Sequence, residues 1–198
     1  MFPLLETIRL KDGRFNNLVY HEGRMRLALK DVLGSADEIN LEEVLKQVPK
    51  PGTGLYKCRL LYDHQSNQVE FTRYTAKSIT SLKVVYDDSI YYRHKFRDRT
   101  ELQNLFMRRG VCDDVLIVKN NRITDTSYAN IALKKGNEWF TPSTFLLAGT
   151  MRQSLLDEHM IREIEIKADE VIHFQSFKLI NAMLLFDGPE MSTENIVN

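Results

Sequence analysis

The stretch of sequence that decides the fold is Tyr92-Arg-His-Lys-Phe-Arg-Asp-Arg-Thr-Glu101, which contains Lys95. Two further stretches follow it along the chain, Ile123-Thr-Asp-Thr-Ser-Tyr-Ala-Asn130 and Gly149-Thr-Met-Arg-Gln153. Together they supply a lysine, an acidic turn and a predicted helix N-terminus. None of the three is diagnostic alone, but their order and spacing suit a site that holds an aldehyde carrying a phosphate group.

Lys95 stands in a run of basic side chains that also contains Arg93, His94, Arg97 and Arg99. Positive neighbours and partial loss of solvent lower the pKa of a lysine amine, which favours the neutral form that attacks an aldehyde. The same run is typical of a solvated basic face, and its density alone favours that interpretation. A contact patch for RNA or DNA is a third interpretation. It is disfavoured by the zero formal net charge and by the lack of interleaved glycine and aromatic residues.

The stretch from Gly149 to Gln153 predicts the start of a helix. Thr150 and Gln153 have the spacing of a capping box, which places Thr150 at the N-cap. The backbone N–H groups and the positive dipole end of a helix start bind phosphate, and Gly149 lets the backbone come close. An ordinary capped helix without a ligand is the other interpretation, and the motif alone favours it.

Asp125 lies in a predicted turn among hydroxyl side chains, and Asn130 follows where the next strand is expected. Asp and Asn in such places usually bond to nearby backbone groups. A carboxylate at a strand end can instead face the ring nitrogen of a bound cofactor. The segment alone favours the local role.

The composition is that of an ordinary globular protein, and 198 residues are enough for one large or two small domains. The 27 basic and 27 acidic side chains balance, which disfavours a dedicated nucleic-acid or membrane-surface binder. We find no apolar run of bilayer-spanning length and no secretory leader, so we expect a cytoplasmic protein. Cys58 and Cys112 are expected to be reduced thiols, and the five histidines lack metal-ligand spacing, so no metal is expected.

The apolar pattern predicts an α+β chain of two domains, a small one over residues 1–80 and a larger, β-rich one over residues 81–198. In the first domain we expect strands at 4–10, 15–20, 55–63 and 68–74, a turn at Asp12-Gly13, and helices over 25–33, ended by Gly34, and over 41–48. In the second we expect strands at 82–86, 113–119, 122–125, 130–134 and 139–141, and helices over 98–110 and 150–160. A capping box is expected at Asp98 and Glu101, and the segment 174–183 is ambiguous.

The whole chain, from about Phe2 to Leu185, resembles the class IV aminotransferases, which are pyridoxal-phosphate (PLP) enzymes of fold type IV. Within that family it is most similar to the bacterial aminodeoxychorismate lyases. The resemblance implies a small α/β domain followed by a larger β-rich domain with flanking helices. It rests on His21-x-x-Arg24, Lys95-x-x-Asp-Arg99-x-Glu101, Asp125-x-x-x-Ala-Asn130, Thr141-Pro142, Gly149-x-Met-Arg-Gln153 and Asn181-Ala182.

The resemblance implies a role for each matching residue. Lys95 is the lysine that joins the cofactor covalently and then shuttles a proton. Arg24 pairs with the cofactor phosphate, a group that suits the forked donors of guanidinium. Thr150 and Met151 supply backbone or hydroxyl contacts to the same phosphate.

The same resemblance places Asp125 opposite the pyridine nitrogen, where a carboxylate strengthens the ring as an electron sink. Asn130 counts among the cofactor-binding residues by its motif position. The resemblance assigns no direct role to Asn130 or to Arg99. Arg9 is a candidate contact for the substrate carboxylate.

The sequence departs from the family pattern in two places. Asp125 stands where the family has glutamate, so the carboxylate is one methylene shorter. The chain also begins at the strand Leu5-Glu-Thr-Ile-Arg9, so we expect an N-terminally shortened small domain. These departures bear on how firmly the cofactor ring is held and on the form of the substrate pocket.

The activity implied by the resemblance is a PLP-dependent lyase that converts 4-amino-4-deoxychorismate to 4-aminobenzoate and pyruvate, a step of folate biosynthesis. The alternative is an aminotransferase of branched-chain or D-amino acids with the same cofactor site. A non-catalytic relative that uses the basic run for binding is a hypothesis from another class. The family also implies a homodimer acting on a small amino-acid-like substrate.

Overall fold

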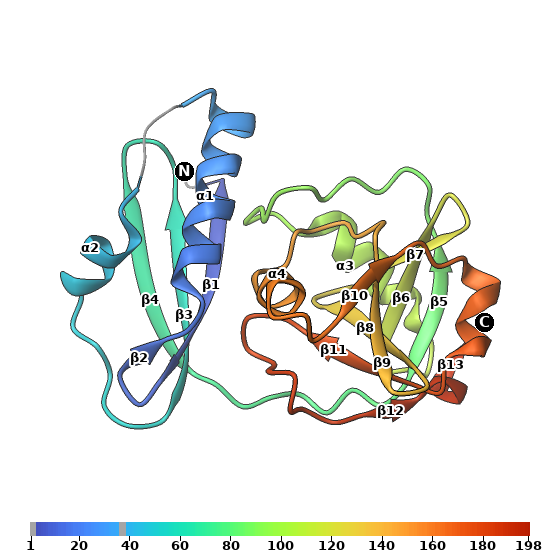
Figure 1. Cartoon of the computed structure of the whole chain (residues 1–198). Helices are drawn as coiled ribbons and strands as arrows, with labels where there is room; N and C mark the ends of the chain where they lie inside the picture. The colour runs from blue at the N-terminus through green and yellow to red at the C-terminus, as the bar shows by residue number, and fades with distance from the viewer. Residues whose placement is uncertain (1–2, 36–38) are drawn as a thin grey trace. The chain divides into compact units, whose positions relative to one another are not determined.

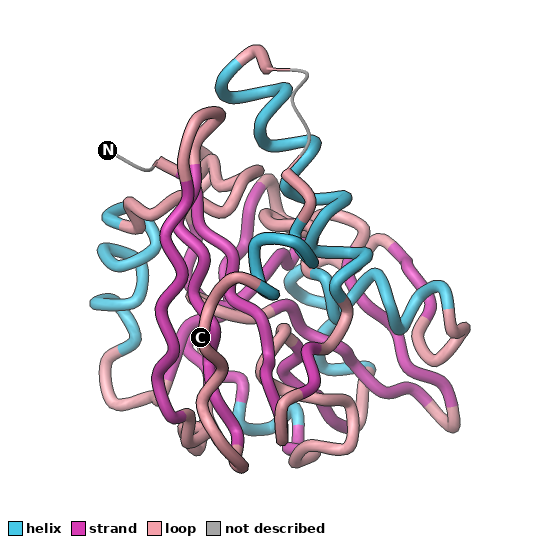
Figure 2. The backbone as a smooth tube through the Cα atoms, turned by 90° about the vertical axis from the view of Figure 1, so that its left-hand side faces the viewer, coloured by secondary structure: helices cyan, strands magenta, loops and turns pink. Residues whose placement is uncertain are grey.

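The computed structural model describes residues 3–35 and 39–198, so Phe2, where the resemblance begins, lies outside the described residues. The chain divides into two compact units (Figure 1). Unit 1 comprises Met1–Ala76 and His94–Asp98, and unit 2 comprises Lys77–Arg93 and Arg99–Asn198. Strands, drawn in magenta in Figure 2, are joined by loops and short helices, as an α+β chain requires.

Unit 1 is an antiparallel sheet with two helices. The sheet has the order β2-β1-β3-β4, with β1 at Leu4–Lys11, β2 at Arg14–Phe15, β3 at Leu55–Tyr62 and β4 at Asn67–Arg73. The helices are α1 (Leu18–Leu33) and α2 (Leu41–Lys46). Buried leucine and isoleucine side chains of β1 pack with Met25 and Leu29 of α1 to form the core of this unit. The predicted turn is confirmed, because Asp12 and Gly13 both have positive φ and join β1 to β2.

The strand predicted at residues 15–20 is wrong beyond Phe15. Asn17 adopts the left-handed conformation with φ of 57°, which ends the strand, and α1 begins at Leu18. Asparagine tolerates that conformation better than most residues, so the chain can turn there directly into the helix. The predicted end at Gly34 is confirmed, since its φ is 64° and its N–H bonds to the Lys30 carbonyl at 3.1 Å.

The segment that carries Lys95 belongs to unit 1. The Leu5 N–H donates to the Lys95 carbonyl at 2.9 Å, and the Arg97 N–H donates to the Pro3 carbonyl at 2.9 Å. Phe96 packs against the core of unit 1. The sequence had assigned Lys95 to the larger domain with a boundary after residue 80, whereas the chain crosses into unit 2 after Ala76 and returns for His94–Asp98.

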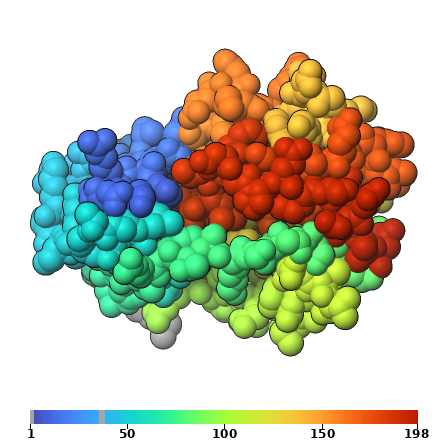
Figure 3. All heavy atoms as spheres, turned by 90° about the horizontal axis from the view of Figure 1, so that it is seen from below, coloured from blue at the N-terminus to red at the C-terminus, as the bar shows by residue number. Residues whose placement is uncertain are grey.

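Unit 2 contains two sheets, of orders β10-β9-β8-β11-β12 and β13-β5-β6-β7. The first sheet consists of β8 (Asn130–Lys135), β9 (Glu138–Pro142), β10 (Arg162–Ile164), β11 (Ser176–Ile180) and β12 (Met191–Ser192). The second consists of β5 (Leu82–Tyr86), β6 (Asp114–Lys119), β7 (Arg122–Thr126) and β13 (Ile196–Val197). Both sheets contribute to one apolar core, which includes Leu116 and Phe177. The C-terminal residues lie at the surface of this unit (red in Figure 3), where β13 pairs with β5.

The predicted strands of unit 2 are confirmed to within two residues at their ends, and the ambiguous segment contains the strand β11. The two predicted helices are shorter than expected: α3 spans Thr100–Phe106, with the 3-10 helix η1 (Met107–Arg109) after it, and α4 spans Thr150–Asp157. The capping box predicted at Asp98 is wrong, because the N-cap of α3 is Arg99 and its side chain makes no capping bond. The 3-10 helix η2 (Ala168–His173) precedes β11, and η3 (Thr193–Asn195) precedes β13.

Candidate active site

A buried carboxylate at the centre of unit 1 binds two of the motif residues. Glu6 points inward from β1, and His21 and Arg24 lie one helical turn apart on α1, so both reach the same point. Arg24 donates from Nε to Glu6 Oε1 at 2.9 Å and from Nη2 to Oε2 at 2.5 Å. His21 Nδ1 lies 2.6 Å from Glu6 Oε2, and the Glu6 and His21 side chains are fully buried.

Burial and the neighbouring groups of this cluster together set the pKa values of Glu6 and His21. Burial would raise the pKa of the Glu6 carboxyl, but the Arg24 charge and the His21 hydrogen bond outweigh it and lower the pKa to about 2. Burial lowers the pKa of His21, and the positive charges of Arg24 and Lys95 add to that effect against the hydrogen bond to Glu6. Glu6 is therefore ionised at neutral pH, while neutral His21 donates from Nδ1 and keeps Nε2 as an acceptor.

The cluster orients the guanidinium that the family resemblance assigns to the cofactor phosphate. A guanidinium carries five N–H donors, and pairing with one carboxylate engages only part of them. Glu6 was missed by the sequence analysis, which treated its segment as a strand. The available signal was an acidic residue at an inward position, between Leu4 and Ile8 in the period-two pattern of a buried strand.

Lys95 is half-buried in unit 1, beside the strand that carries Glu6. The basic run around it does not act as one group. Arg93 and Arg97 are exposed, whereas His94 is buried with its Nε2 3.4 Å from Asp31 Oδ2. Arg99 belongs to unit 2 and donates to the Ser127 carbonyl at 2.6 Å. The lowered pKa expected for Lys95 stays a prediction.

Arg9, the candidate substrate contact, lies on β1 and is half-buried. Its Nη1 donates to Asn16 Oδ1 at 3.1 Å. Its Nε is buried and finds no hydrogen-bond partner among the residues that the structure describes. A guanidinium with a buried donor of this kind is suited to an anion, and the role of Arg9 in substrate binding stays a prediction.

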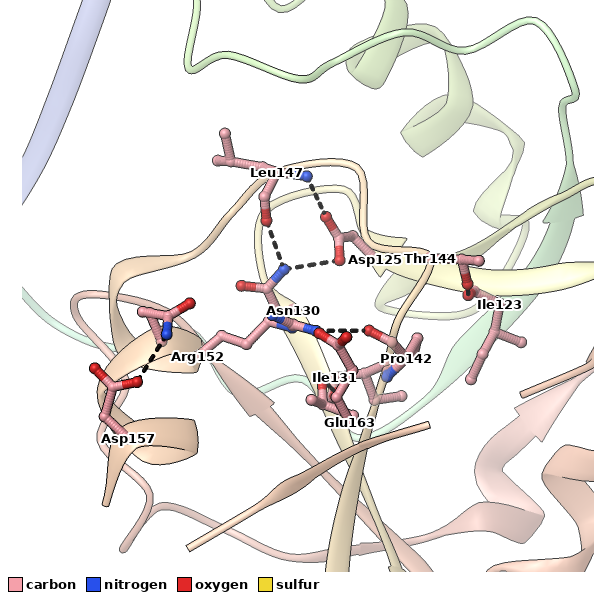
Figure 4. A network of polar contacts seen from close by, with 12 residues as sticks. Ile123, Asp125, Asn130, Ile131, Pro142, Thr144, Leu147, Arg152, Asp157 and Glu163 are labelled. Carbon is pink, nitrogen blue, oxygen red and sulfur yellow. Dashed lines mark hydrogen bonds and ion pairs between the residues drawn. The ribbon is translucent and has the colours of Figure 1, made fainter. Parts of the chain in front are cut away.

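Unit 2 holds the second group of motif residues, in a network around Asp125 (Figure 4). Asp125, at the end of β7, accepts hydrogen bonds at Oδ2 from the N–H groups of Leu146 and Leu147, at 3.0 and 2.9 Å. Its Oδ1 accepts from Asn130 Nδ2 at 2.8 Å, and the same nitrogen donates to the Leu147 carbonyl at 3.0 Å. The carboxylate therefore bonds to backbone groups, but not to the nearby ones that the segment alone favours: its partners lie 21 and 22 residues later, in the segment that leads into α4.

Burial dominates the ionisation of this carboxylate. Desolvation raises the pKa of Asp125 to about 6, and the hydrogen bonds from Leu147, Asn130 and Leu146 only partly oppose it. A buried carboxylate with three neutral donors still has capacity for about one more, and a cationic N–H donor would favour its ionised form.

The start of α4 differs from the predicted capping box. Gly149 is the N-cap and Thr150 is the first helical residue, so the prediction that placed Thr150 at the N-cap is wrong. Gln153, the other half of the expected box, donates from its side chain to Asp157 at 2.8 Å instead. Thr150 and Met151 are buried in the first turn, and the Met151 side chain packs into an apolar cluster, so the contact of Met151 with a phosphate stays a prediction for its backbone.

Arg152 secures α4 to the strands beneath it. Its side chain is 3% exposed and donates to the Pro142 carbonyl at 2.9 Å and to Glu163 of β10. The guanidinium carbon also lies 4.2 Å from the centre of the Phe145 ring. Arg152 belongs to the motif Gly149-x-Met-Arg-Gln153, but its partners Pro142 and Glu163 lie in other elements, which no local pattern reveals.

Three other observations complete the description. Cys58 and Cys112 are free and buried, as expected for reduced thiols. Over the described ranges we find no group of three or more His, Cys, Asp or Glu residues that could hold a metal ion. No helix of residues 3–35 and 39–198 is long and apolar enough to cross a membrane.

Comparison with known proteins places the chain in a family. The sequence model of the family Amino-transferase class IV matches residues 3–186. An uncharacterized protein of Haemophilus influenzae is 36% identical over 185 residues, which are 92% of this chain and 98% of that protein. A proposed 4-amino-4-deoxychorismate lyase from Haemophilus somnus, known from a crystal structure, is 31% identical with a TM-score of 0.89, and the match covers 94% of this chain and 98% of that one.

More distant structures share the fold. A hypothetical aminotransferase of Mycobacterium tuberculosis, in a PLP-bound form, is 14% identical with a TM-score of 0.74 over 92% of this chain and 78% of that one. The chain therefore belongs to the class IV aminotransferase family. It is a PLP-dependent enzyme of fold type IV, which confirms the fold class and the cofactor expected from the sequence.

The residues of each unit fit the parts of PLP. Unit 1 holds Lys95, whose amine suits an aldehyde, and Arg24, whose guanidinium is oriented by Glu6 and suits a phosphate. Unit 2 holds Asp125, a buried carboxylate whose remaining acceptor capacity suits a cationic donor such as a pyridinium N–H. It also holds the start of α4, where backbone N–H groups suit a phosphate.

Proposed function

We propose that this chain is a PLP-dependent lyase that converts 4-amino-4-deoxychorismate to 4-aminobenzoate and pyruvate, a step of folate biosynthesis. The observation that carries the proposal is the likeness to the Haemophilus somnus protein, to which that activity is ascribed. The 31% identity extends over 94% of this chain and 98% of that one. The short length of the present chain is therefore shared with that relative.

The proposed roles follow from the chemistry of each unit. When bound, PLP supplies an electron sink that stabilises negative charge at the α-carbon of the substrate. With the cofactor bound, Lys95 would hold it covalently, and the Lys95 amine would be the base that removes the α-proton of the substrate. Arg9 is proposed to bind a substrate carboxylate.

The remaining residues hold the cofactor. Arg24 binds the phosphate, held in orientation by Glu6. Thr150 and Met151 donate to the same phosphate from the first turn of α4. Asp125 pairs with the pyridine nitrogen and keeps it protonated, and Asn130 belongs to this site through its bond to Asp125.

The second candidate function is transamination of a branched-chain or D-amino acid. The family description favours it, because aminotransferases give the family its name. The two reactions use the same cofactor site and the same proton removal. They differ in the next step: elimination releases pyruvate and an aromatic amine without a second substrate, whereas transamination needs an oxo acid to take up the amino group.

A product assay separates the two candidates. The purified protein, loaded with PLP, is incubated with 4-amino-4-deoxychorismate in the absence of any oxo acid. We expect equal amounts of 4-aminobenzoate and pyruvate. Turnover that requires 2-oxoglutarate, with no 4-aminobenzoate formed, would show that the aminotransferase interpretation is right and the lyase proposal wrong.

We further propose that the protein works as a cytoplasmic homodimer and binds neither nucleic acid nor membranes. The family resemblance supports the dimer, and the balance of 27 basic and 27 acidic side chains supports the absence of polyanion binding. Light scattering of the PLP-loaded protein tests the first part, and a monomeric mass would contradict it.

A further inference from the structure

One side-chain amide joins the two functional parts of unit 2. Asn130 Nδ2 donates to Asp125 Oδ1 at 2.8 Å and to the Leu147 carbonyl at 3.0 Å. These two bonds use both N–H groups of the amide, and the acceptors come from β7 and from the loop before α4. In Figure 4 the Asn130 amide points toward both partners.

The other end of the same amide fixes the residue before α4. A methyl group on Gly149 would lie 1.8 Å from Asn130 Oδ1, closer than non-bonded atoms can approach, and 3.0 Å from its Cγ. Gly149 has φ of −71° and ψ of 134°, which any residue can adopt. Glycine is therefore required at this position for space, because the Asn130 side chain occupies the volume of a Cβ.

Asp125 holds the same loop from its second oxygen. Oδ2 accepts from the N–H groups of Leu146 and Leu147, so the carboxylate and the amide together contact residues 146, 147 and 149. Asp125 and Asn130 are both 5% exposed, which makes each of these bonds stronger than it would be in solvent. A change at Asn130 therefore alters the position of the carboxylate and of the helix start at the same time.

We propose that Asn130 is a positioning residue that sets the spacing between the Asp125 carboxylate and the start of α4. It thereby matches the ring-nitrogen end of the cofactor site to the phosphate end. The inference rests on the proposed cofactor roles of Asp125 and Thr150. It gives Asn130, which counts among the cofactor-binding residues by its motif position alone, a role that acts through Asp125 and Gly149.

The first test compares PLP binding by the wild type, Asn130→Ser and a matched control, Thr144→Val. Thr144 Oγ1 donates to the Ile123 carbonyl at 2.7 Å. Thr144→Val therefore also removes a bond between this loop and β7, but its side chain bonds to neither Asp125 nor Gly149. In titrations followed by visible absorbance, we expect roughly tenfold weaker PLP binding for Asn130→Ser and little change for Thr144→Val.

The pH dependence of the visible band provides a readout that loop stability alone would not move. Without the Asn130 donor, the Asp125 carboxylate is less stable in its ionised form, so the pyridine nitrogen is protonated less. The nitrogen that joins Lys95 to the cofactor then keeps its proton to higher pH. The pH at the midpoint of the change in the visible band therefore rises. Equal affinities and equal midpoints in Asn130→Ser and Thr144→Val would overturn the proposal.

The steric part is tested by Gly149→Ala and by the double variant Gly149→Ala/Asn130→Ser. We expect Gly149→Ala to weaken PLP binding and the added serine to restore part of it, because the shorter side chain vacates the contested volume. A double variant as weak as the two losses added together would contradict the proposal. Should Asn130→Ser alone not fold, Gly149→Ala supplies the comparison with Thr144→Val, since it displaces the amide without removing it.

The wild type separates failure of this inference from failure of the proposed function. A wild-type protein that develops no visible band with PLP would refute the cofactor roles, and the inference with them. A normal wild-type band, together with variants that do not differ from the control, refutes the role of Asn130 alone.

Discussion

Glu6 holds Arg24 through a paired contact, with 2.9 Å between Oε1 and Nε and 2.5 Å between Oε2 and Nη2. The Glu6 side chain is fully buried and that of Arg24 is 9% exposed. Buried ion pairs rarely add much net stability, but removal of one partner is costly, since it leaves the other charge uncompensated. The pair is therefore better understood as a device that orients the guanidinium than as a source of stability.

Glu6→Gln should lower the free energy of unfolding by about 3 kcal/mol at pH 7, because the buried Arg24 loses its counter-ion. The matched control is Glu70→Gln, which breaks the Arg59–Glu70 contact of 3.6 Å at the surface of the same unit and should cost less than about 1 kcal/mol. Urea unfolding measures both, and PLP titration should show weaker binding only for Glu6→Gln.

The stability difference between wild type and Glu6→Gln should shrink as the pH falls from about 4.5 toward 2, where Glu6 becomes protonated. A difference that stays constant over this range would mean that Glu6 is not ionised in the folded protein.

Asp125 predicts a pH dependence of the opposite sign. Its pKa is raised from 3.8 to about 6, so between these values the folded chain binds more protons than the unfolded chain. The contribution of Asp125 to stability is therefore fully present below about pH 4 and is lost as the pH rises through 6, by up to about 3 kcal/mol.

The measurement for Asp125 compares urea unfolding of the PLP-free wild type with that of Asp125→Asn at several pH values. The stability of the wild type relative to the variant should fall as the pH rises from 4 to 6 and then level off. With PLP bound, the pyridinium favours the ionised carboxylate and the fall should be smaller. A relative stability that rises over this range would show that the carboxylate is stabilised in its ionised form without the cofactor.

The sequence predicted those features that depend on local pattern. The strand Leu82–Tyr86 was predicted at its observed ends because a short, mostly apolar run with two valines between polar segments is typical of a strand. The turn at Asp12-Gly13 and the helix end at Gly34 were found because those residues are suited to positive φ. The capping boxes failed at Asp98 and Thr150, because the spacing of an acceptor to a Glu or Gln three residues later also arises by chance in a polar segment.

The candidate site likewise contains residues that local sequence patterns reveal and contacts that they do not. Lys95 and Asp125 could be singled out through motif order, whereas the partners of Asp125 could not. Leu146 and Leu147 contribute only backbone N–H groups, which leave no mark on the sequence. The steric reason for Gly149 also depends on Asn130, which is 19 residues earlier and at the start of the strand β8.

Lys95→Ala should abolish the visible absorption band that develops with PLP, because the amine that binds the aldehyde is lost. The control is Lys77→Ala, which removes an exposed lysine from the other unit and should leave the band unchanged. Absorbance after removal of free PLP provides the measurement. A Lys95→Ala protein that keeps the band would show that another lysine carries the cofactor, and a wild type without one would favour the non-catalytic interpretation.

Arg152 ties the start of α4 to two strands. Its loss should therefore disturb the proposed cofactor site at the start of α4 and lower the stability of the fold. Arg152→Met keeps the length of the side chain but removes the bonds to Pro142 and Glu163 and the cation beside Phe145. We expect the free energy of unfolding to fall by about 2 kcal/mol, the sum of these lost contacts less the apolar packing that methionine retains. Arg162→Met is the matched control, because Arg162 pairs with Glu138 of the same sheet at 2.7 Å while both side chains are mostly exposed. That pair should contribute less than about 0.5 kcal/mol. If urea unfolding gave equal losses for the two variants, the buried contacts of Arg152 would not be what holds α4 in place.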